Sequence, residues 1–398
     1  MITYDKAKEL VLANIQDFGI QKISLDKAIG HVLAEDVFAD RDFPPFNRAT
    51  KDGVAINYAA LEKGIQSFPI QAIAAAGSPQ KELKSSDKCI EIMTGAVVPT
   101  NTDTVVMYEH LEIEEDLVKL LKPVKKGQNI HIQGSDEAKG TIVLNKGTKI
   151  EAAEIGVLAS VGKIEVLVKK MPKIVLVSTG DELVDVSETP RLHQIRKSNS
   201  HTLKAALLNE TIVANAIHIA DDKETTKSEI LEALKQNDVL LLSGGVSKGK
   251  YDYLPKVFEE LGVKKIFHRV KQRPGKPFWF GKHKETNTTI FAFPGNPAST
   301  FANYHIYFKP WLNLSLGLPE SEITVILNER FENNTDLTRF IRAKVKMDSA
   351  KLIASLVLGN GSGDLTSLTK ANGFVLLEPN KIYEAGAAVP FFSTRTIL

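Results

Sequence analysis

The sequence of 398 residues has a single cysteine, Cys89, and almost no net charge. One thiol excludes an intrachain disulfide and any metal site built from several thiolates. Lys and Arg number 50 against 48 for Asp and Glu, so there is no overall electrostatic reason to bind nucleic acid or an anionic membrane. No apolar run approaches the roughly 18 residues of a bilayer span, and the first residues lack a signal-peptide core. These absences predict a cytoplasmic protein without nucleic-acid or membrane partners.

Two nucleotide-binding motifs and a zinc pattern are also missing. There is no G-x-x-x-x-G-K-[ST] and no G-x-G-x-x-G, which excludes a Walker-type NTPase and a standard dinucleotide domain. The nine histidines show no paired ligand spacing for Zn²⁺. What remains is the composition of an ordinary globular chain, 43% apolar and 25% charged, and a length that predicts two to four domains.

The pattern of predicted strands and helices changes along the chain. Residues 67–135 read as short strands broken by Gly and Pro, which predicts a small β domain inserted into another domain. Between residues 173 and 308 buried apolar runs alternate with helical segments, which indicates a mostly parallel sheet covered on both faces. After Pro319 the short alternating segments predict a small β-barrel.

Three polar, Gly-rich turns follow three predicted strands of the α/β segment. They are STGDE at 178–182, SGGVSKG at 243–249 and PGNPAS at 294–299. Ligands of open α/β sheets bind outside the carboxyl ends of the strands, and glycines let main-chain N–H groups approach phosphate oxygens. One such turn on its own is more often ordinary strand-to-helix geometry. Three in one domain favour a phosphate or nucleotide site.

Acidic residues lie near the same edge, and they allow two interpretations. Asp221 and Asp222 precede a helix, so they could cap it or favour its dipole. Alternatively, carboxylates beside phosphates hold Mg²⁺, which prefers oxygen ligands. The segment 268–276 adds four positive charges, and its Pro-Gly turn would point Arg273 and Lys276 at one place. Such a pair of charges suits an anion of high charge, whereas the alternative interpretation of the segment is a solvated edge strand.

Taken together, the motifs resemble the molybdopterin molybdenumtransferases, the MoeA family, which are related to the carboxyl-terminal part of gephyrin. The matching segments are PPFNRATKDGVAI, IMTGAVVPTNTDTVVMYE, STGDEL, SGGVSKGKYD, PGKP, PGNPAS and GSGDLTSLTKANG, in this order along nearly the whole chain. The first segment departs most from the family pattern, with Asn47 and Arg48 for a typical Asp-Asn, but it keeps Asp52.

This resemblance implies a multidomain fold of α/β plus β type. It comprises an elongated N-terminal domain (1–43 and 138–172), an inserted β domain (44–137), a doubly wound α/β domain like MogA and MoaB (173–318) and a C-terminal β-barrel (319–398). Family members are homodimers, so the active cleft is expected between the α/β domain of one subunit and the inserted domain of the other.

The resemblance also implies a reaction in molybdenum cofactor biosynthesis. Molybdate is inserted into adenylylated molybdopterin with Mg²⁺-dependent cleavage of the pyrophosphate link, which yields molybdenum cofactor and AMP. Other cofactor-biosynthesis proteins are possible partners. Two alternatives are a gephyrin-like scaffold and a MogA-like molybdopterin adenylyltransferase. The acidic motif positions are all present, which a scaffold need not keep, and the front half and barrel have no counterpart in MogA.

The site residues carried over by the resemblance fall into three groups. The expected catalytic residues are Asp52, Thr94, Asp136, Glu182 and Asp252. The expected metal ligands are Glu182, Asp221 and Asp252. The expected substrate-binding residues are Ser178, Thr179, Gly180, Ser200, Ser243, Gly244, Gly245, Ser247, Arg269, Arg273, Lys276, Pro294, Gly295, Asn296, Pro297 and Ser362. Arg269 and Arg273 replace lysines of many relatives, and a guanidinium cannot serve as a general acid near neutral pH.

Overall fold

A computed structural model describes residues 1–246, 253–320 and 322–397 of the chain. They form two compact units. The first comprises Met1–Lys22, Gly30–Val32 and Leu167–Leu398, and the second comprises Ile23–Ile29 and Leu33–Val166. Among the residues described, no helix combines the length and the apolar character that crossing a bilayer requires.

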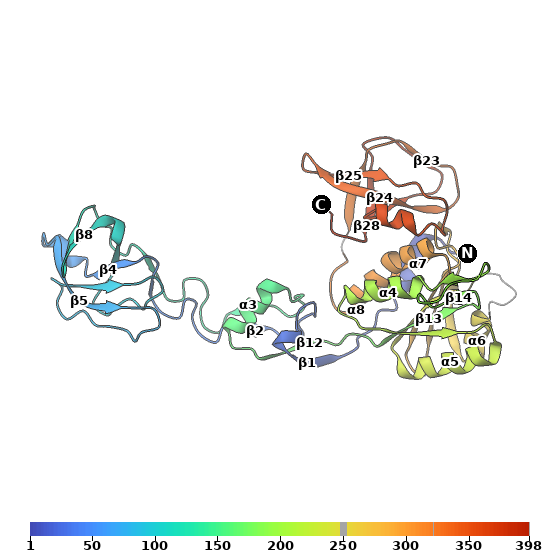
Figure 1. The fold of residues 1–398 in the computed structure, drawn as a ribbon, viewed down its shortest axis with the longest axis horizontal. Helices are drawn as coiled ribbons and strands as arrows, with labels where there is room; N and C mark the ends of the chain where they lie inside the picture. Colours follow the sequence, from blue (N-terminus) through green and yellow to red (C-terminus); the bar gives the residue numbers. More distant parts are fainter. Residues whose placement is uncertain (247–252, 321, 398) are drawn as a thin grey trace. The chain divides into compact units, whose positions relative to one another are not determined.

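A six-stranded sheet forms the centre of the first unit (Figure 1), in the order β16-β13-β17-β21-β20-β18. The first four strands run parallel, and β20 and β18 are added antiparallel to their neighbours. The mostly parallel sheet confirms the α/β prediction, although β20 was not predicted, because it follows a Pro-Gly turn without a polar break. The strands are β13 (Ile174–Thr179), β16 (Asn215–Ile219), β17 (Val239–Ser243), β18 (Val263–His268), β20 (Trp279–His283) and β21 (Thr289–Phe293).

Helices cover both faces of this sheet, as Figure 1 shows. The central strands are apolar on both sides because both sides are buried: in β17, Leu241 faces one core and Leu240 the other. One face packs against α1 (Tyr4–Leu12), α4 (Asn199–Leu208), α7 (Pro297–Asn303) and α8 (Lys309–Ser315). The other packs against α5 (Lys223–Gln236) and α6 (Leu254–Glu260).

A π-helical turn, Tyr304–Phe308, connects α7 to α8 and carries a buried histidine. His305 is 8% exposed, and neither of its ring nitrogens has a hydrogen-bond partner within the described chain. Burial and, to a smaller extent, the positive charge of Lys309 lower the pKa of His305 to about 3. The ring is therefore neutral in the folded state, whereas in the unfolded chain it takes up a proton near pH 6.5. Because the unfolded state binds more protons between these two pKa values, acid favours unfolding there.

We expect His305→Phe to remove this acid sensitivity. Between pH 7.5 and pH 5 the free energy of unfolding of the parent should fall by about 2 kcal/mol more than that of the variant, at about 1.4 kcal/mol per pH unit below pH 6.5. Phenylalanine suits the position because the ring centroid of His305 lies 4.5 Å from that of Phe301, in an aromatic environment. Both tryptophans, Trp279 and Trp311, are buried in this unit, so their fluorescence during urea unfolding measures its stability. If the free energy of unfolding changed equally with pH in the two proteins, His305 would not be the source of the acid sensitivity.

The last part of the first unit is the predicted β-barrel. Five strands pair in the order β24-β25-β22-β28-β26, and β26 pairs with β24 to close the barrel. A short strand of the α/β part, β19 (Gln272–Arg273), pairs in parallel with β24. The 3₁₀ turn η4 (Thr366–Lys370) lies between β25 and β26, and β23 (Phe331–Asn333) pairs with β27 (Lys381–Tyr383). The barrel strands are β22 (Ile323–Leu327), β24 (Thr338–Asp348), β25 (Lys351–Leu356), β26 (Gly373–Leu377) and β28 (Ala388–Ser393).

The second unit contains its own six-stranded sheet, in the order β7-β4-β6-β5-β9-β8. Its strands are β4 (Gly53–Ile56), β5 (Ser67–Ala74), β6 (Cys89–Ile92), β7 (Thr104–Met107), β8 (Leu111–Glu114) and β9 (Leu117–Leu120). Two short pairs accompany it, β3 (Arg48–Ala49) with β10 (Ile130–His131) and β2 (Val37–Phe38) with β11 (Ile142–Leu144). Helices α2 (Ala59–Glu62) and α3 (Ala152–Ser160) and the 3₁₀ turns η1 (Leu25–Lys27) and η2 (Tyr108–His110) complete it. The four domain boundaries proposed from the sequence stay a prediction.

Candidate functional site

The three Gly-rich turns of the α/β part line a single cavity of about 560 Å³. The register explains this: Ser178 of β13 lies opposite Ser243 of β17, which lies opposite Phe293 of β21. The predicted residues that line the cavity are Ser178, Thr179, Gly180, Glu182, Ser200, Asp221, Ser243, Gly244, Gly245, Pro294, Gly295, Asn296 and Pro297. Ser247 and Asp252 lie outside the described residues.

Two of these glycines have positive φ values and lie close to neighbouring side chains. At Gly245, where φ is +69°, a Cβ would lie 2.5 Å from a Leu254 methyl group. At Gly180, where φ is +125°, a Cβ would lie 2.4 Å from a carboxylate oxygen of Glu182. Both conformations also disfavour side chains intrinsically. The absence of a side chain at Gly180 therefore lets the Glu182 carboxylate lie close to the backbone of this turn.

The structure distinguishes the roles of the neighbouring residues Asp221 and Asp222, for which the sequence allows two interpretations. The Asp222 side chain accepts the Thr225 N–H at 2.8 Å and caps α5, and hydrogen bonds from Thr225 lower its pKa. Asp221 lines the cavity instead, and its N–H donates to the Asp181 side chain at 3.1 Å. Asp222 is therefore a helix cap, whereas Asp221 lines the cavity.

The cavity suits a hard cation only together with a phosphate. No cluster of three His, Cys, Asp or Glu side chains with the spacing of a metal site occurs in the described ranges. Two acidic residues, Glu182 and Asp221, line the cavity together with Ser178 and Ser243. Mg²⁺ is commonly bound by one or two carboxylates, with substrate phosphates and water completing its shell. The residues present fit that arrangement.

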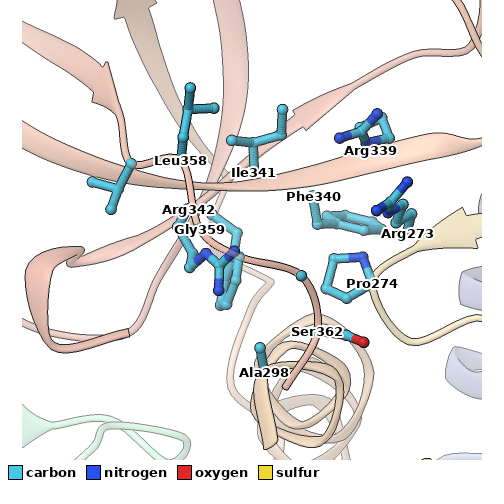
Figure 2. Close-up of a pocket in the computed structure, with 13 residues that line it drawn as sticks. Arg273, Pro274, Ala298, Arg339, Phe340, Ile341, Arg342, Leu358, Gly359 and Ser362 are labelled. Carbon is cyan, nitrogen blue, oxygen red and sulfur yellow. The ribbon is translucent and has the colours of Figure 1, made fainter. Parts of the chain in front are cut away.

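A second, smaller cavity of about 110 Å³ is lined by three arginines, Arg273, Arg339 and Arg342. Figure 2 shows Arg273 and Arg339 close together, with Phe340 between them and Arg342. Arg273 and Arg339 are register neighbours in the β19–β24 pair. Neither has a hydrogen-bond or ion-pair acceptor in the part of the chain that the structure describes. Burial lowers the pKa of Arg339, and the like charge of Arg273 lowers it further. Two unneutralised guanidiniums thus share one small space.

Arg342 differs because protein atoms already hold it. It donates to the Ser367 hydroxyl at 2.6 Å and to the Asp364 carbonyl at 3.3 Å. The Asp364 carboxylate accepts the N–H groups of Asn360 and Ser367, which lowers its pKa to about 2. Arg342 therefore helps to fix the loop that carries Ser362.

Ser362 and Asn296 connect the two cavities. The Asn296 side chain donates to the Ser362 hydroxyl at 2.8 Å, and the Ala298 N–H donates to the Ser362 carbonyl at 3.1 Å. Asn296 lines the large cavity, Ser362 lines the arginine cavity, and both line a third cavity that includes Lys276. Arg269 lines none of these three.

Arg339 and Arg342 are site-lining residues that the sequence analysis missed. The segment RFIRAKV predicts only a barrel strand, and nothing in it indicates that β19 pairs with this strand. Lys197 and Asn199 also line the large cavity without having been predicted. For the arginines, the available signal was two cations beside apolar residues on a strand of a small barrel, where a charged side chain requires a partner or a ligand.

The three predicted residues of the second unit gather around β3. The Asp52 side chain accepts the Thr94 N–H at 2.7 Å. Arg48 of β3 lies opposite His131 of β10, and its guanidinium lies 3.2 Å from His131 Nδ1. His131 Nε2 lies 2.8 Å from an Asp136 carboxylate oxygen. Arginine can only donate, so Nδ1 accepts and the Nε2–H faces Asp136.

Comparisons with known proteins give matches along nearly the whole chain. Residues 2–162 match the MoeA N-terminal region (domains I and II), 175–313 a probable molybdopterin binding domain and 324–393 the MoeA C-terminal region (domain IV). A molybdopterin molybdenumtransferase of Synechocystis sp. is 36% identical over 99% of this chain and 100% of its own, and one of Staphylococcus aureus is 32% identical over 94% and 91%. The molybdopterin biosynthesis MoeA protein of Pyrococcus horikoshii has a similar structure, with a TM-score of 0.81, 27% identity and coverage of 98% and 99%. The chain therefore belongs to the MoeA family of molybdopterin molybdenumtransferases, enzymes of molybdenum cofactor biosynthesis.

Proposed function

We propose that this enzyme takes adenylylated molybdopterin and molybdate and forms molybdenum cofactor and AMP. In this reaction the bridging P–O bond breaks, and AMP leaves with the bridging oxygen. An oxygen from water or molybdate replaces it on the pterin phosphate. The two dithiolene sulfurs replace one oxygen of molybdate on molybdenum, and that oxygen leaves with the two thiol protons as water. The observation that carries the proposal is the connection, through Asn296 and Ser362, between a cavity suited to phosphates and a cavity suited to an oxyanion.

The large cavity supplies what a pyrophosphate link needs. Its Gly-rich turns present main-chain N–H groups, and helix α4 begins at Asn199 on its wall. The residue before this helix, Ser198, makes no side-chain capping bond, so the first N–H groups of α4 can face a phosphate. Lys197 adds a positive charge beside them. Together these groups can hold an anionic substrate and stabilise negative charge on the departing phosphate.

Magnesium belongs to the same proposal. Glu182 and Asp221 would hold the ion, and Asp252, outside the described residues, is the third ligand expected from the family resemblance. When bound, the ion supplies positive charge to phosphate oxygens as the anhydride breaks. The carboxylates of the protein place that charge, while the turns orient the substrate.

The arginine cavity is the proposed place of molybdate. Arg273 and Arg339 provide planar donors that match oxyanion geometry, and no protein carboxylate competes for them among the described residues. The Ser362 hydroxyl lies on the same wall. An anion bound there would also relieve the repulsion between the two guanidiniums.

One experiment separates the proposed activity from the two alternatives. Purified protein is incubated with adenylylated molybdopterin, with and without molybdate and Mg²⁺, and AMP is measured by chromatography. We expect AMP release to require both molybdate and the divalent ion. Binding of the compound without any AMP release would indicate a scaffold. A parallel incubation with molybdopterin and MgATP tests the other alternative, because formation of adenylylated molybdopterin there would indicate an adenylyltransferase.

A further inference from the structure

A network of buried polar side chains lies beneath the turn that carries Arg273 and Lys276. Gln272 and Asn303 are completely buried, and Tyr307 is 1% exposed. The Gln272 amide donates to the Pro274 carbonyl at 3.0 Å and to the Asn303 side-chain oxygen at 2.9 Å. Its own oxygen accepts the Tyr307 hydroxyl. The network therefore runs from the helical segment after α7 to the backbone of the turn.

Two further hydrogen bonds fix the next residue of the turn. The Asn303 amide donates to the Gly275 carbonyl at 3.3 Å, and the Gly275 N–H donates to the Ser299 hydroxyl at 3.2 Å. A Cβ on Gly275 would lie 2.2 Å from the Asn303 side-chain oxygen. The turn is thus pressed against the network with no room for a side chain.

We propose that Gln272, Asn303 and Tyr307, with Ser299, form a positioning network that holds the Arg273 guanidinium in the arginine cavity and thereby sets the affinity for the oxyanion substrate. This rests on the proposed function, because it assumes that the cavity takes molybdate. Arg273 follows Gln272 directly and pairs with the barrel strand at Arg339. A shift of the turn would therefore change the spacing of the two guanidiniums that must share one anion.

The network has the properties expected of a positioning device. The Gln272 amide has partners for both its oxygen and its nitrogen, so its orientation is determined. The Phe278 ring centroid lies 4.8 Å from that of Tyr307, which holds the tyrosine in place. None of the four side chains lines the arginine cavity. Their effect on an anion bound there must therefore pass through the turn.

The chain offers matched controls for a test. Tyr304 and Tyr307 are both 1% exposed and belong to the same π-helical turn, but the Tyr304 hydroxyl has no acceptor among the described residues. Ser299 and Ser315 are both buried serines that accept one backbone N–H, from Gly275 and from Gln16 respectively. Tyr307→Phe and Ser299→Ala disturb the network, whereas Tyr304→Phe and Ser315→Ala make the same chemical changes away from it.

The measurements are KM for molybdate, KM for adenylylated molybdopterin and kcat in the AMP-release assay, together with direct calorimetric titration of molybdate. For Tyr307→Phe we expect the molybdate KM and dissociation constant to rise about tenfold, the effect of losing roughly one hydrogen bond to a charged group. The pterin KM and kcat should stay within about twofold, because uniform binding of one substrate is lost. Ser299→Ala should act in the same direction, and both controls should match the parent.

Two outcomes would overturn the positioning role. The first is a folded Tyr307→Phe or Ser299→Ala protein that binds molybdate like the parent, even if its melting temperature falls. The second is a parent protein that binds no molybdate at all. Calorimetry keeps the two proposals distinguishable: a parent that binds molybdate but releases no AMP contradicts the proposed reaction, while the comparison of the variants still decides the role of the network.

Discussion

Replacing Glu182 with glutamine, or Asp221 with asparagine, should lower the rate of molybdate-dependent AMP release by about a hundredfold or more. Both side chains line the phosphate cavity. Removing one carboxylate withdraws charge that places the divalent ion, and loss of such electrostatic stabilisation typically reduces kcat by two to three orders of magnitude. Each variant should also need more Mg²⁺ to reach half of its maximal rate. The measurement is AMP release across a Mg²⁺ titration.

The neighbouring aspartate provides the control. Asp222→Asn makes the same change one residue along the chain, but Asp222 caps α5 and asparagine caps helices about as well. This variant should therefore keep the parental rate and the parental Mg²⁺ response. If Asp221→Asn behaved like Asp222→Asn in both respects, Asp221 would be only a residue of the turn before α5, and the metal assignment at this edge would have to be abandoned.

The sheet edge was predictable because local sequence and long-range packing agree there. Runs such as KIVLVS and DVLLLS are apolar on both faces, which only a strand covered on both sides allows. Parallel strands end at the same edge, so the turns after β13, β17 and β21 had to meet. The family matches cover this part of the chain as well, since residues 175–313 match a probable molybdopterin binding domain.

The arginine cavity could not be predicted in the same way. It depends on β19, a two-residue strand, pairing with β24, more than 60 residues later. No hydrophobic period marks a strand this short, and register between distant segments is not encoded locally. The buried network around Gln272 could not be predicted for the same reason. Its members are separated by up to 35 residues, and each one alone resembles an ordinary polar residue of a helix or turn.

The predicted site residues around β3 could be assigned only by the family resemblance. Asp52, Thr94 and Asp136 were assigned by resemblance, and the composition of their loops gave them no role. The structure brings them together through backbone pairs: the Ala49 N–H donates to Ala96, and the Gly95 N–H donates back to Ala49. The Arg48–His131–Asp136 chain was not predicted, although Arg48 lies within the first quoted segment. The catalytic roles of Asp52, Thr94 and Asp136, the homodimer, the other partner proteins and the cytoplasmic location stay predictions.

The two acid sets should act together only in a dimer. Glu182 and Asp221 belong to the first unit, and Asp52 and Asp136 belong to the second. Following the family resemblance, we propose an obligate homodimer in which each site takes one set from each subunit, since a reacting anhydride needs walls that exclude water on both sides. Mixtures of two inactive variants test this directly, because the composite site and the single-chain site give opposite results.

Mixing inactive Asp52→Ala with inactive Glu182→Ala subunits should restore roughly a quarter of the parental activity. Random exchange makes about half of the dimers mixed, and each mixed dimer has one intact site and one doubly altered site. A mixture of Asp52→Ala with Asp136→Ala is the control: both changes fall on the same unit, so every site keeps one defect and no activity should return. AMP release is measured after subunit exchange has been verified with differently tagged chains. If exchange is complete and the first mixture remains as inactive as the control, both acid sets serve a site within one chain, and the composite site is wrong.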